Sequence, residues 1–333
     1  MNVKGYKKYL IKNSIQKEVI TEYVNYLKDY EKFLSKENQS LATASPEKII
    51  DYSESLILSE KAYVLNFLEA ITSYANYSKR NDYITKVIDI SESYNAMDNL
   101  YSRVAEYYGE SLRDLILKDL KIPPLGTHPE KKPTFTKLIL NRLREKLGKE
   151  KMIDLLSPCL HGRPPDDIEG DKKILTELGI DRFLKKKHQD LVARLERHRD
   201  EGTLEFAQRI DDEIVNYVKE HPIIAHGVRK KNRIYVSKLP YQMRKFLDAK
   251  NDQMKRFFLC YCPWVRGAIK NATENEISEY FCHCSAGWYK LYWDQIFDHP
   301  VKVEPVVTGL SGALECKFAI TIPENILKTI IRK

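Results

Sequence analysis

The sequence has 333 residues, 43% hydrophobic and 31% charged, a balance that excludes disordered, collagen-like and disulfide-stapled chains. At this length two or three folded domains are expected, since typical domains span about 100 to 150 residues. The longest apolar runs fall far short of the roughly 20 residues that cross a bilayer. The first residues include lysines and no apolar stretch, so we do not expect them to direct export. We therefore expect a cytoplasmic protein that does not enter the membrane and that works in a reducing compartment.

The net charge of +8 is unevenly distributed. Residues 1–118 hold 16 Lys and Arg against 17 Asp and Glu, whereas the remaining residues hold 39 against 30. Because phosphate neutralisation supplies most non-specific affinity for nucleic acid, the neutral N-terminal region argues against DNA as a partner. The one dense basic run, residues 185–187, lies among acidic residues at helical spacing. This pattern favours a solvated helix face, with an anion-binding patch as the alternative.

The N-terminal third has the apolar periodicity of a small helical bundle. Ser45 and Pro46 mark the start of one helix, as cap and first helical residue. The other helices are expected at residues 15–34, 59–77, 82–92 and 94–118. The many tyrosines of this region are spaced like core residues, so we expect them inside the bundle rather than on a surface that stacks with bases.

Proline and glycine gather in residues 121–133, which we expect to link a domain of residues 1–120 to one of residues 134–333. Further helices are expected at 134–157, 173–199 and 203–220, and strands at 232–237, 256–262, 301–307 and 313–322. Glycines at 309 and 312 predict a hairpin between the last two strands. The predicted fold class is α+β, with an all-helical N-terminal bundle followed by helices packed on a mostly antiparallel sheet.

Five of the six cysteines fall close together near the C-terminus, which is the most informative feature of the chain. They are Cys260, Cys262, Cys282, Cys284 and Cys316. A Cys-x-Cys pair on a strand points both sulfurs to one face, so pairs on neighbouring strands would converge on one site. Such a density of soft thiolates suits zinc or, alternatively, an iron–sulfur cluster. A reactive thiol and buried structural cysteines are the competing interpretations.

Histidine and glutamate side chains could complete such a site. His283 or His161 could serve as imidazole ligand, and Cys159 with His161 could donate ligands from a turn outside the sheet, as a lid. The sequence leaves the role of these two residues open, since a loop histidine is more often a surface residue. Glu304 is the candidate general base or the partner of a metal-bound histidine, and His283 is the second candidate proton carrier.

Three further residues are expected to bind a cofactor or small ligand. Arg266, near the start of a short helix at 264–271, could hold an anionic group, with a surface position as the alternative. Lys238 and Tyr241 mark a turn from strand to helix and are expected to face the same pocket.

Three stretches around the cysteines carry a family resemblance: 232–241 (NRIYVSKLPY), 255–266 (KRFFLCYCPWVR) and 281–290 (FCHCSAGWYK). Through them residues 134–323 resemble a family of cytoplasmic proteins of anaerobic bacteria and archaea. The hairpin at 301–320 is similar to the C-terminus of 4-vinyl reductase-like and L-2-amino-thiazoline-4-carboxylate hydrolase-like domains. The resemblance implies a fold shared with haem-nitric-oxide-binding sensors and a pocket for a small molecule, in some relatives next to a cysteine-bound metal.

The N-terminal region resembles a different family. Residues 23–34 (YVNYLKDYEKFL) and 68–74 (LEAITSY) are similar to the core-binding, SAM-like helical domain with which tyrosine recombinases clamp DNA. We expect no recombination, because no tyrosine that could serve as the C-terminal nucleophile of that family follows Tyr292, although His226 and Arg229 have the His-x-x-Arg spacing. We expect residues 1–120 to bind a protein partner or to self-associate.

Three functions remain open on the sequence alone. The first is a cytoplasmic sensor-like protein that binds a metal or a small molecule at a cysteine-lined site. The alternative is a thiol- or metal-dependent hydrolase, in which bound metal activates water. The third is a DNA-binding regulator that acts through its N-terminal bundle. No phosphate-binding loop, nucleophile elbow or zinc-protease helix motif favours a named enzyme class.

Overall fold

The computed structural model describes residues 1–61, 63–162, 166–206 and 208–330. The chain divides into two compact units, one of Met1–Tyr94 with Pro123–Lys132 and the other of Asn95–Ile122 with Pro133–Lys333. These units differ from the predicted domains because the helices after Asn95 share a core with the C-terminal part. The predicted α+β class is confirmed. Among the described residues, no helix combines the length and apolar character that crossing a bilayer requires.

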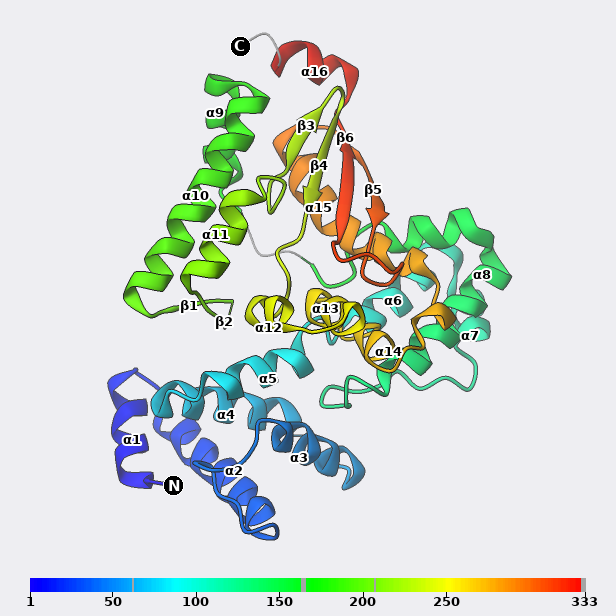
Figure 1. Cartoon of the computed structure of the whole chain (residues 1–333). Coiled ribbons are helices and arrows are strands. Elements are labelled where there is room, and N and C mark those ends of the chain that lie inside the picture. The colour runs from blue at the N-terminus through cyan, green and yellow to red at the C-terminus, as the bar shows by residue number, and fades with distance from the viewer. Residues whose placement is uncertain (62, 163–165, 207, 331–333) are drawn as a thin grey trace. The chain divides into compact units, whose positions relative to one another are not determined.

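The first unit is a bundle of helices whose apolar faces meet in one core (Figure 1). Tyr6, Tyr30 and Tyr83 are completely buried in it, so the prediction that tyrosines of this region form core is confirmed for these three. Arg80 stacks on the ring of Tyr83 and donates hydrogen bonds to the loop before the third helix. The helices are α1 (Val3–Lys12), α2 (Lys17–Ser35), α3 (Glu47–Leu58), α4 (Val64–Ser78) and α5 (Asn81–Ser91).

The second unit begins with six helices. They are α6 (Ala96–Tyr108), α7 (Glu110–Leu117), α8 (Lys132–Leu156), α9 (Ile168–Leu178), α10 (Ile180–Glu201) and α11 (Asp212–Glu220). Gly109 separates α6 from α7 with a φ of 89°, a backbone conformation that favours glycine. Leu100 on α6 and Leu143 on α8 pack in one core with Trp264, which is completely buried. The helices α6 to α8 therefore belong with the cysteine-rich C-terminal part.

A four-stranded antiparallel sheet forms the other core of this unit, with strand order β3-β4-β6-β5. Its strands are β3 (Val228–Lys230), β4 (Arg233–Ser237), β5 (Lys302–Val307) and β6 (Lys317–Thr321); a short pair, β1 (Leu204–Glu205) and β2 (Gln208–Arg209), lies apart. The predicted hairpin is confirmed, because β5 pairs antiparallel with β6. Helix α15 (His283–Ile296) lies along the sheet (Figure 1), and Tyr289 on this helix packs against Phe318 on β6 with ring centroids 5.2 Å apart.

The strand predicted at 256–262 is wrong. Residues 252–259 form helix α13 (Asp252–Leu259), whose N-terminus is capped by the Asn251 side chain, which accepts from the N–H of Met254. The prediction failed because the continuous apolar run before Cys260 is compatible with a buried strand as well as with a helix. The Asn251 cap is the local sequence signal that favours the helix. The remaining short elements are α12 (Met243–Asp248), α14 (Arg266–Lys270), α16 (Glu324–Ile330) and the 3₁₀ turns η1 (Glu274–Glu276) and η2 (Glu279–Cys282).

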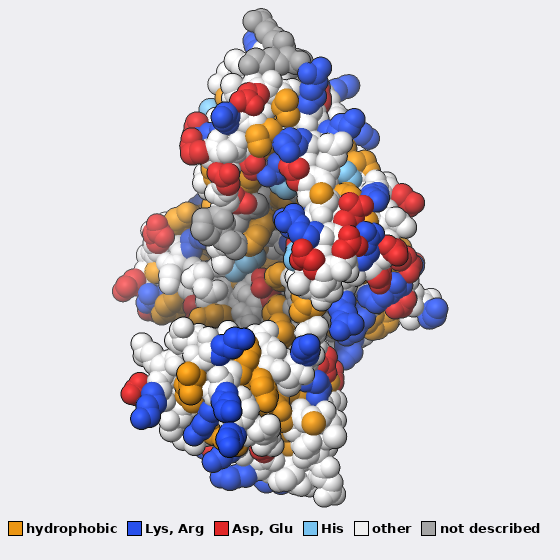
Figure 2. All heavy atoms as spheres, turned by 90° about the vertical axis from the view of Figure 1, so that its left-hand side faces the viewer, with side chains coloured by type: hydrophobic (Ala, Val, Ile, Leu, Met, Phe, Trp, Pro, Cys, Tyr) orange, Lys and Arg blue, Asp and Glu red, His pale blue; other side chains and the backbone are white. Residues whose placement is uncertain are grey.

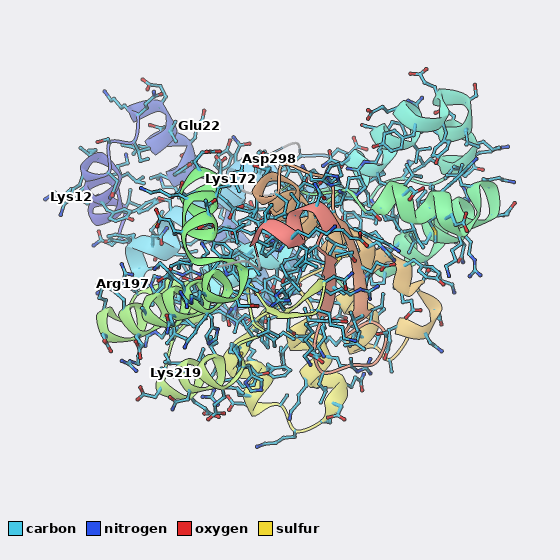
Figure 3. The ribbon with its side chains drawn as sticks, turned by 90° about the horizontal axis from the view of Figure 1, so that it is seen from above. Lys12, Glu22, Lys172, Arg197, Lys219 and Asp298 are labelled. Carbon is cyan, nitrogen blue, oxygen red and sulfur yellow. The ribbon has the colours of Figure 1, made fainter. Side chains whose placement is uncertain are left out.

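The surface near α9 and α10 carries paired charges rather than a basic patch. Figure 2 shows positive and negative side chains intermingled in the upper part of the view. Lys186 pairs with Asp190 at 3.0 Å on the exposed face of α10, which agrees with a solvated helix face, whereas Lys187 pairs at 2.8 Å with the buried Asp171. Lys172 on α9 lies beside Asp298 after α15 (Figure 3), with an ion pair of 2.8 Å that joins these two segments.

Candidate metal centre

The loop that follows α8 is held in place by side chains of α6. The guanidinium of Arg103 donates to the carbonyl oxygens of Leu155 and Pro158, each at 2.7 Å, and to that of Cys159 at 3.2 Å. The side-chain amide of Asn99 donates to the carbonyl oxygen of Leu160. Hydrogen bonds from a charged group are the stronger ones, so Arg103 fixes the backbone from which Cys159 projects.

Helix α15 approaches this loop at Gly287. A Cβ at this position would lie 2.2 Å from the carbonyl oxygen of Ser157 and 2.5 Å from the nitrogen of Cys159, so only glycine permits the contact. Residues three apart share a helix face, and Cys284 therefore faces the same loop as Gly287. The N–H of Leu160 donates to the Sγ of Cys284 at 3.3 Å.

Three potential metal ligands converge where the loop meets the helix. The side chains of Cys159, His161 and Cys284 place their ligand atoms within 4.8 Å of one another. The Nδ1 of His161 lies 3.4 Å from the Sγ of Cys159 and 3.6 Å from that of Cys284. The imidazole stacks on Trp288 with ring centroids 5.6 Å apart, which fixes its plane.

These distances match those of a tetrahedral zinc site. With Zn–S of about 2.3 Å and Zn–N of about 2.0 to 2.1 Å, tetrahedral geometry separates sulfur from nitrogen by about 3.6 Å. Both observed Sγ to Nδ1 distances lie within 0.2 Å of that value. Cys159 and Cys284 are buried and His161 is half-buried, so a bound ion would be largely shielded from solvent.

The two thiols of this group shift each other's pKa in opposite directions. The pKa of Cys159 is lowered to about 4, chiefly because the Cys284 thiol hydrogen-bonds to it and also because of His161. The same contact, together with burial, raises the pKa of Cys284. The lowered pKa favours the thiolate form of Cys159, which is the form that binds metal.

The other four predicted metal ligands do not belong to this group of three ligand atoms. Cys260 and Cys262 follow α13, Cys282 ends η2, and Cys316 precedes β6. They lie off the strands, so the prediction that strand alternation orients the Cys-x-Cys pairs is wrong for both pairs. All six cysteines are free thiols.

The three residues predicted to bind a cofactor gather beside these four cysteines. Arg266 is 3% exposed, and its guanidinium lies 4.7 Å from the ring centroid of Tyr241. The ammonium of Lys238 lies 5.1 Å from the ring of Tyr261, which packs against Tyr241 at 5.1 Å. Lys238 also donates to the Oγ of Ser285, the residue after Cys284, at 3.2 Å. The side chains of Arg266, Tyr241, Tyr261 and Lys238 therefore form a continuous row of cationic and aromatic groups that ends near the N-terminus of α15.

The two predicted catalytic residues lie near each other but outside the group of three ligands. Burial lowers the pKa of His283, and the nearby carboxylate of Glu304 opposes that effect. Glu304 itself forms an ion pair with Lys302 at 2.7 Å. The potential metal ligand on α15 is Cys284, and His283 does not belong to the group of three ligand atoms found among the described residues.

No family model, curated protein or solved structure matches this chain. The family resemblances therefore stay predictions, and function is argued from the geometry of the site. Of the ligands predicted with the C-terminal cysteines, the centre contains Cys284, and it adds Cys159 and His161, whose role the sequence left open. Their Cys-x-His spacing was the signal that could have placed them at a metal site.

Proposed function

We propose that this chain is a cytoplasmic zinc-binding protein, with Cys159, His161 and Cys284 as ligands. The observation that carries the proposal is the separation of the ligand atoms, which is that of a tetrahedral zinc site. Two thiolates and one imidazole suit zinc better than magnesium or calcium, which prefer oxygen ligands. The reducing compartment keeps the thiols available.

The way the ligands are supported favours a binding site over an accidental contact. Arg103 holds the carbonyls around Cys159, Trp288 fixes the ring of His161, and Gly287 admits the loop. Such supporting residues orient ligands in known metal sites, and their loss typically lowers metal affinity by about 10- to 100-fold.

Among the described residues three ligands converge, which leaves a fourth position for water or a small molecule. Structural zinc sites are usually closed by four protein ligands, whereas catalytic and ligand-binding sites keep one position open. We therefore propose that the bound metal takes a small ligand in a sensor-like role. The ammonium of Lys238, which reaches Ser285 next to Cys284, would favour an anionic ligand at that position.

The same open position supports a second candidate, a metal-dependent hydrolase. Zinc held by Cys159, His161 and Cys284 would activate a water molecule as nucleophile, and His283, the residue before Cys284, could carry a proton with Glu304 acting on it. This candidate is the one that the resemblance to amino-thiazoline-carboxylate hydrolase-like proteins favours. Binding of a protein partner by residues 1–120, with DNA not expected, is proposed alongside either role.

Metal analysis of the full chain tests the proposal. Protein purified under reducing conditions should contain about one zinc per chain at the Cys159 site, and Cys159→Ser, His161→Ala and Cys284→Ser should each lose most of it. Ser157→Ala is the matched control, because its side chain bonds the carbonyl of Ile153 in the preceding turn. Zinc that persists in all three ligand variants would refute the site.

A further inference from the structure

We propose that the helical bundle of the first unit binds a small organic amine, a ligand with an apolar body and a protonated amino group. The site is an open cavity of about 550 Å³, lined by α1, α2, α4 and α5 and by the segment between α1 and α2 (Figure 1). Small-molecule sites are typically cavities of about 300 to 1,000 Å³, mostly apolar, with a few polar groups that orient the ligand. The proposal does not rest on the zinc site, because Cys159, His161 and Cys284 lie in the other unit.

One face of α4 forms a wall of the cavity. Its lining residues recur every three or four positions and therefore share that face: Leu65, Leu68, Glu69, Thr72, Ser73 and Asn76. At the rise of a helix, the face is about 16 Å long from its first to its last member. Its N-terminal part is apolar and its C-terminal part is polar, with the carboxylate of Glu69 between them. The cavity therefore suits a ligand that is apolar at one end and polar at the other.

The lining of the cavity is mostly apolar. Leu10, Leu68 and Val87 lie deepest and are 0%, 2% and 8% exposed, whereas Leu65 is 49% exposed at the mouth. The apolar body of a ligand would remove this surface from water, which is the main favourable contribution to binding in such a cavity.

Glu69 gives the cavity its charge. Among the described residues that line the cavity, Glu69 is the one with a charged side chain, and it forms no ion pair with the described Lys and Arg residues. Burial raises the pKa of Tyr23, and the carboxylate of Glu69, to which the Tyr23 hydroxyl hydrogen-bonds, raises it further. The ring of Tyr9 also lines the cavity, and an aromatic face attracts cations. A protonated amine would therefore find both a carboxylate and an aromatic ring in the lining.

Two helices end at the cavity. Asn13, the C-cap of α1, and Ser91, the last residue of α5, both line it. The C-terminus of a helix carries a partial negative charge, which stabilises a nearby cation. Lys12, the basic residue of the last turn of α1, is exposed and does not line the cavity. Both helix ends therefore favour a positively charged group on the ligand.

The polar side chains of the lining use their donors within their own helices. The hydroxyls of Thr72 and Ser91 each donate to the carbonyl oxygen four residues earlier, at 2.7 and 2.9 Å, and the side-chain amide of Asn13 does the same at 2.8 Å. A hydroxyl has one donor and two acceptor lone pairs, so the groups left for a ligand are acceptors. The N–H groups of a protonated amine match these acceptors, whereas an anionic ligand would need donors.

Ligand-observed NMR titration of the full chain tests the proposal with three probes of similar size: phenethylamine, the neutral phenethyl alcohol and the anionic phenylacetate. The amine should bind with a dissociation constant of about 1 mM or below, and the alcohol about tenfold more weakly. Phenylacetate should not bind, because the carboxylate of Glu69 repels it. Glu69→Gln keeps the size of the side chain and removes its charge, so it should lower the affinity for the amine about tenfold and leave that for the alcohol unchanged.

Two further variants control this result. Glu22→Gln removes the same charge from an exposed position on α2 outside the cavity, and it should bind all three probes as the wild type does. Thr72→Phe places a large side chain in the cavity and should abolish binding of the amine and the alcohol alike. A cooperative thermal unfolding transition shows that this variant is folded.

Other results would overturn the amine site. These are a wild type that binds none of the probes, an amine affinity equal to that of the alcohol, preferred binding of phenylacetate, and amine binding that persists undiminished in Glu69→Gln or Thr72→Phe. Binding of a capped peptide with Phe next to Lys, without binding of the free amine, would make a protein side chain the occupant and would overturn a small-molecule site. None of these readouts involves zinc, so the amine site and the zinc site fail separately.

Discussion

Gly287→Ala should weaken zinc binding without touching a ligand. The added Cβ would lie 2.2 Å from the carbonyl oxygen of Ser157, whereas 3.4 Å is the lower limit of ordinary contact, so the loop must move by about 1.2 Å. Metal–ligand distances tolerate only about 0.2 Å. Because Cys159 and His161 lie on the displaced loop and Cys284 does not, we expect zinc affinity to fall by at least about tenfold.

The effect of this substitution on stability has two opposing parts. Overpacking against backbone atoms costs about 1 to 3 kcal/mol, while replacing glycine by alanine within a helix gains about 1 kcal/mol. The expected net result is a loss of about 1 kcal/mol in the free energy of unfolding of the metal-free protein, measured by denaturant titration. Zinc affinity is measured by competition with a chromophoric chelator.

Gly202→Ala is the matched control for Gly287→Ala. Gly202 ends α10 with a φ of 64° and has open space where a Cβ would lie, so alanine there costs about 1 to 2 kcal/mol through backbone strain alone. Its zinc affinity should equal that of the wild type. If Gly287→Ala binds zinc as tightly as Gly202→Ala, the close approach of α15 to the loop does not determine the ligand geometry and the reasoning is refuted.

Three further predictions concern Arg103, the pH dependence of stability and DNA. Arg103→Met removes the bonds to the carbonyls around Cys159 and should cost about 2 to 3 kcal/mol of unfolding free energy, together with a roughly tenfold loss of zinc affinity; wild-type affinity would contradict this. In the metal-free protein the lowered pKa of Cys159 means that the folded state binds fewer protons than the unfolded state between pH about 4 and 9, so stability from this thiolate rises with pH in that window. The stability difference between wild type and Cys159→Ala should therefore grow from pH 5 to pH 8, and a constant difference would contradict the shift. The full chain should bind duplex DNA more weakly than about 1 μM at about 50 mM salt, as measured by fluorescence anisotropy, and tighter binding would restore the DNA-binding hypothesis.

The sequence by itself determined the elements whose pattern is local. Apolar periodicity predicted α2 and the strands β4 and β5, and the two glycines predicted the hairpin that joins β5 to β6. These predictions are confirmed because side-chain periodicity and turn geometry depend on residues close in sequence. The sequence also predicted that cysteines could bind a metal, and that stays a prediction. The strand predicted at 256–262 was wrong, because an apolar run of that length is compatible with a helix or a strand.

Only the tertiary structure decided which side chains form a site. His161 and Cys284 are 123 residues apart, and no sequence pattern over such a distance fixes their separation of 3.6 Å. That distance results from the packing of α15 on the loop after α8, which needs Gly287 on one side and Arg103 on the other. Residues far apart in sequence come together because helices and loops pack against one another. A local sequence pattern indicates which residues are able to bind a metal, but it does not show which of them lie close together in the folded chain.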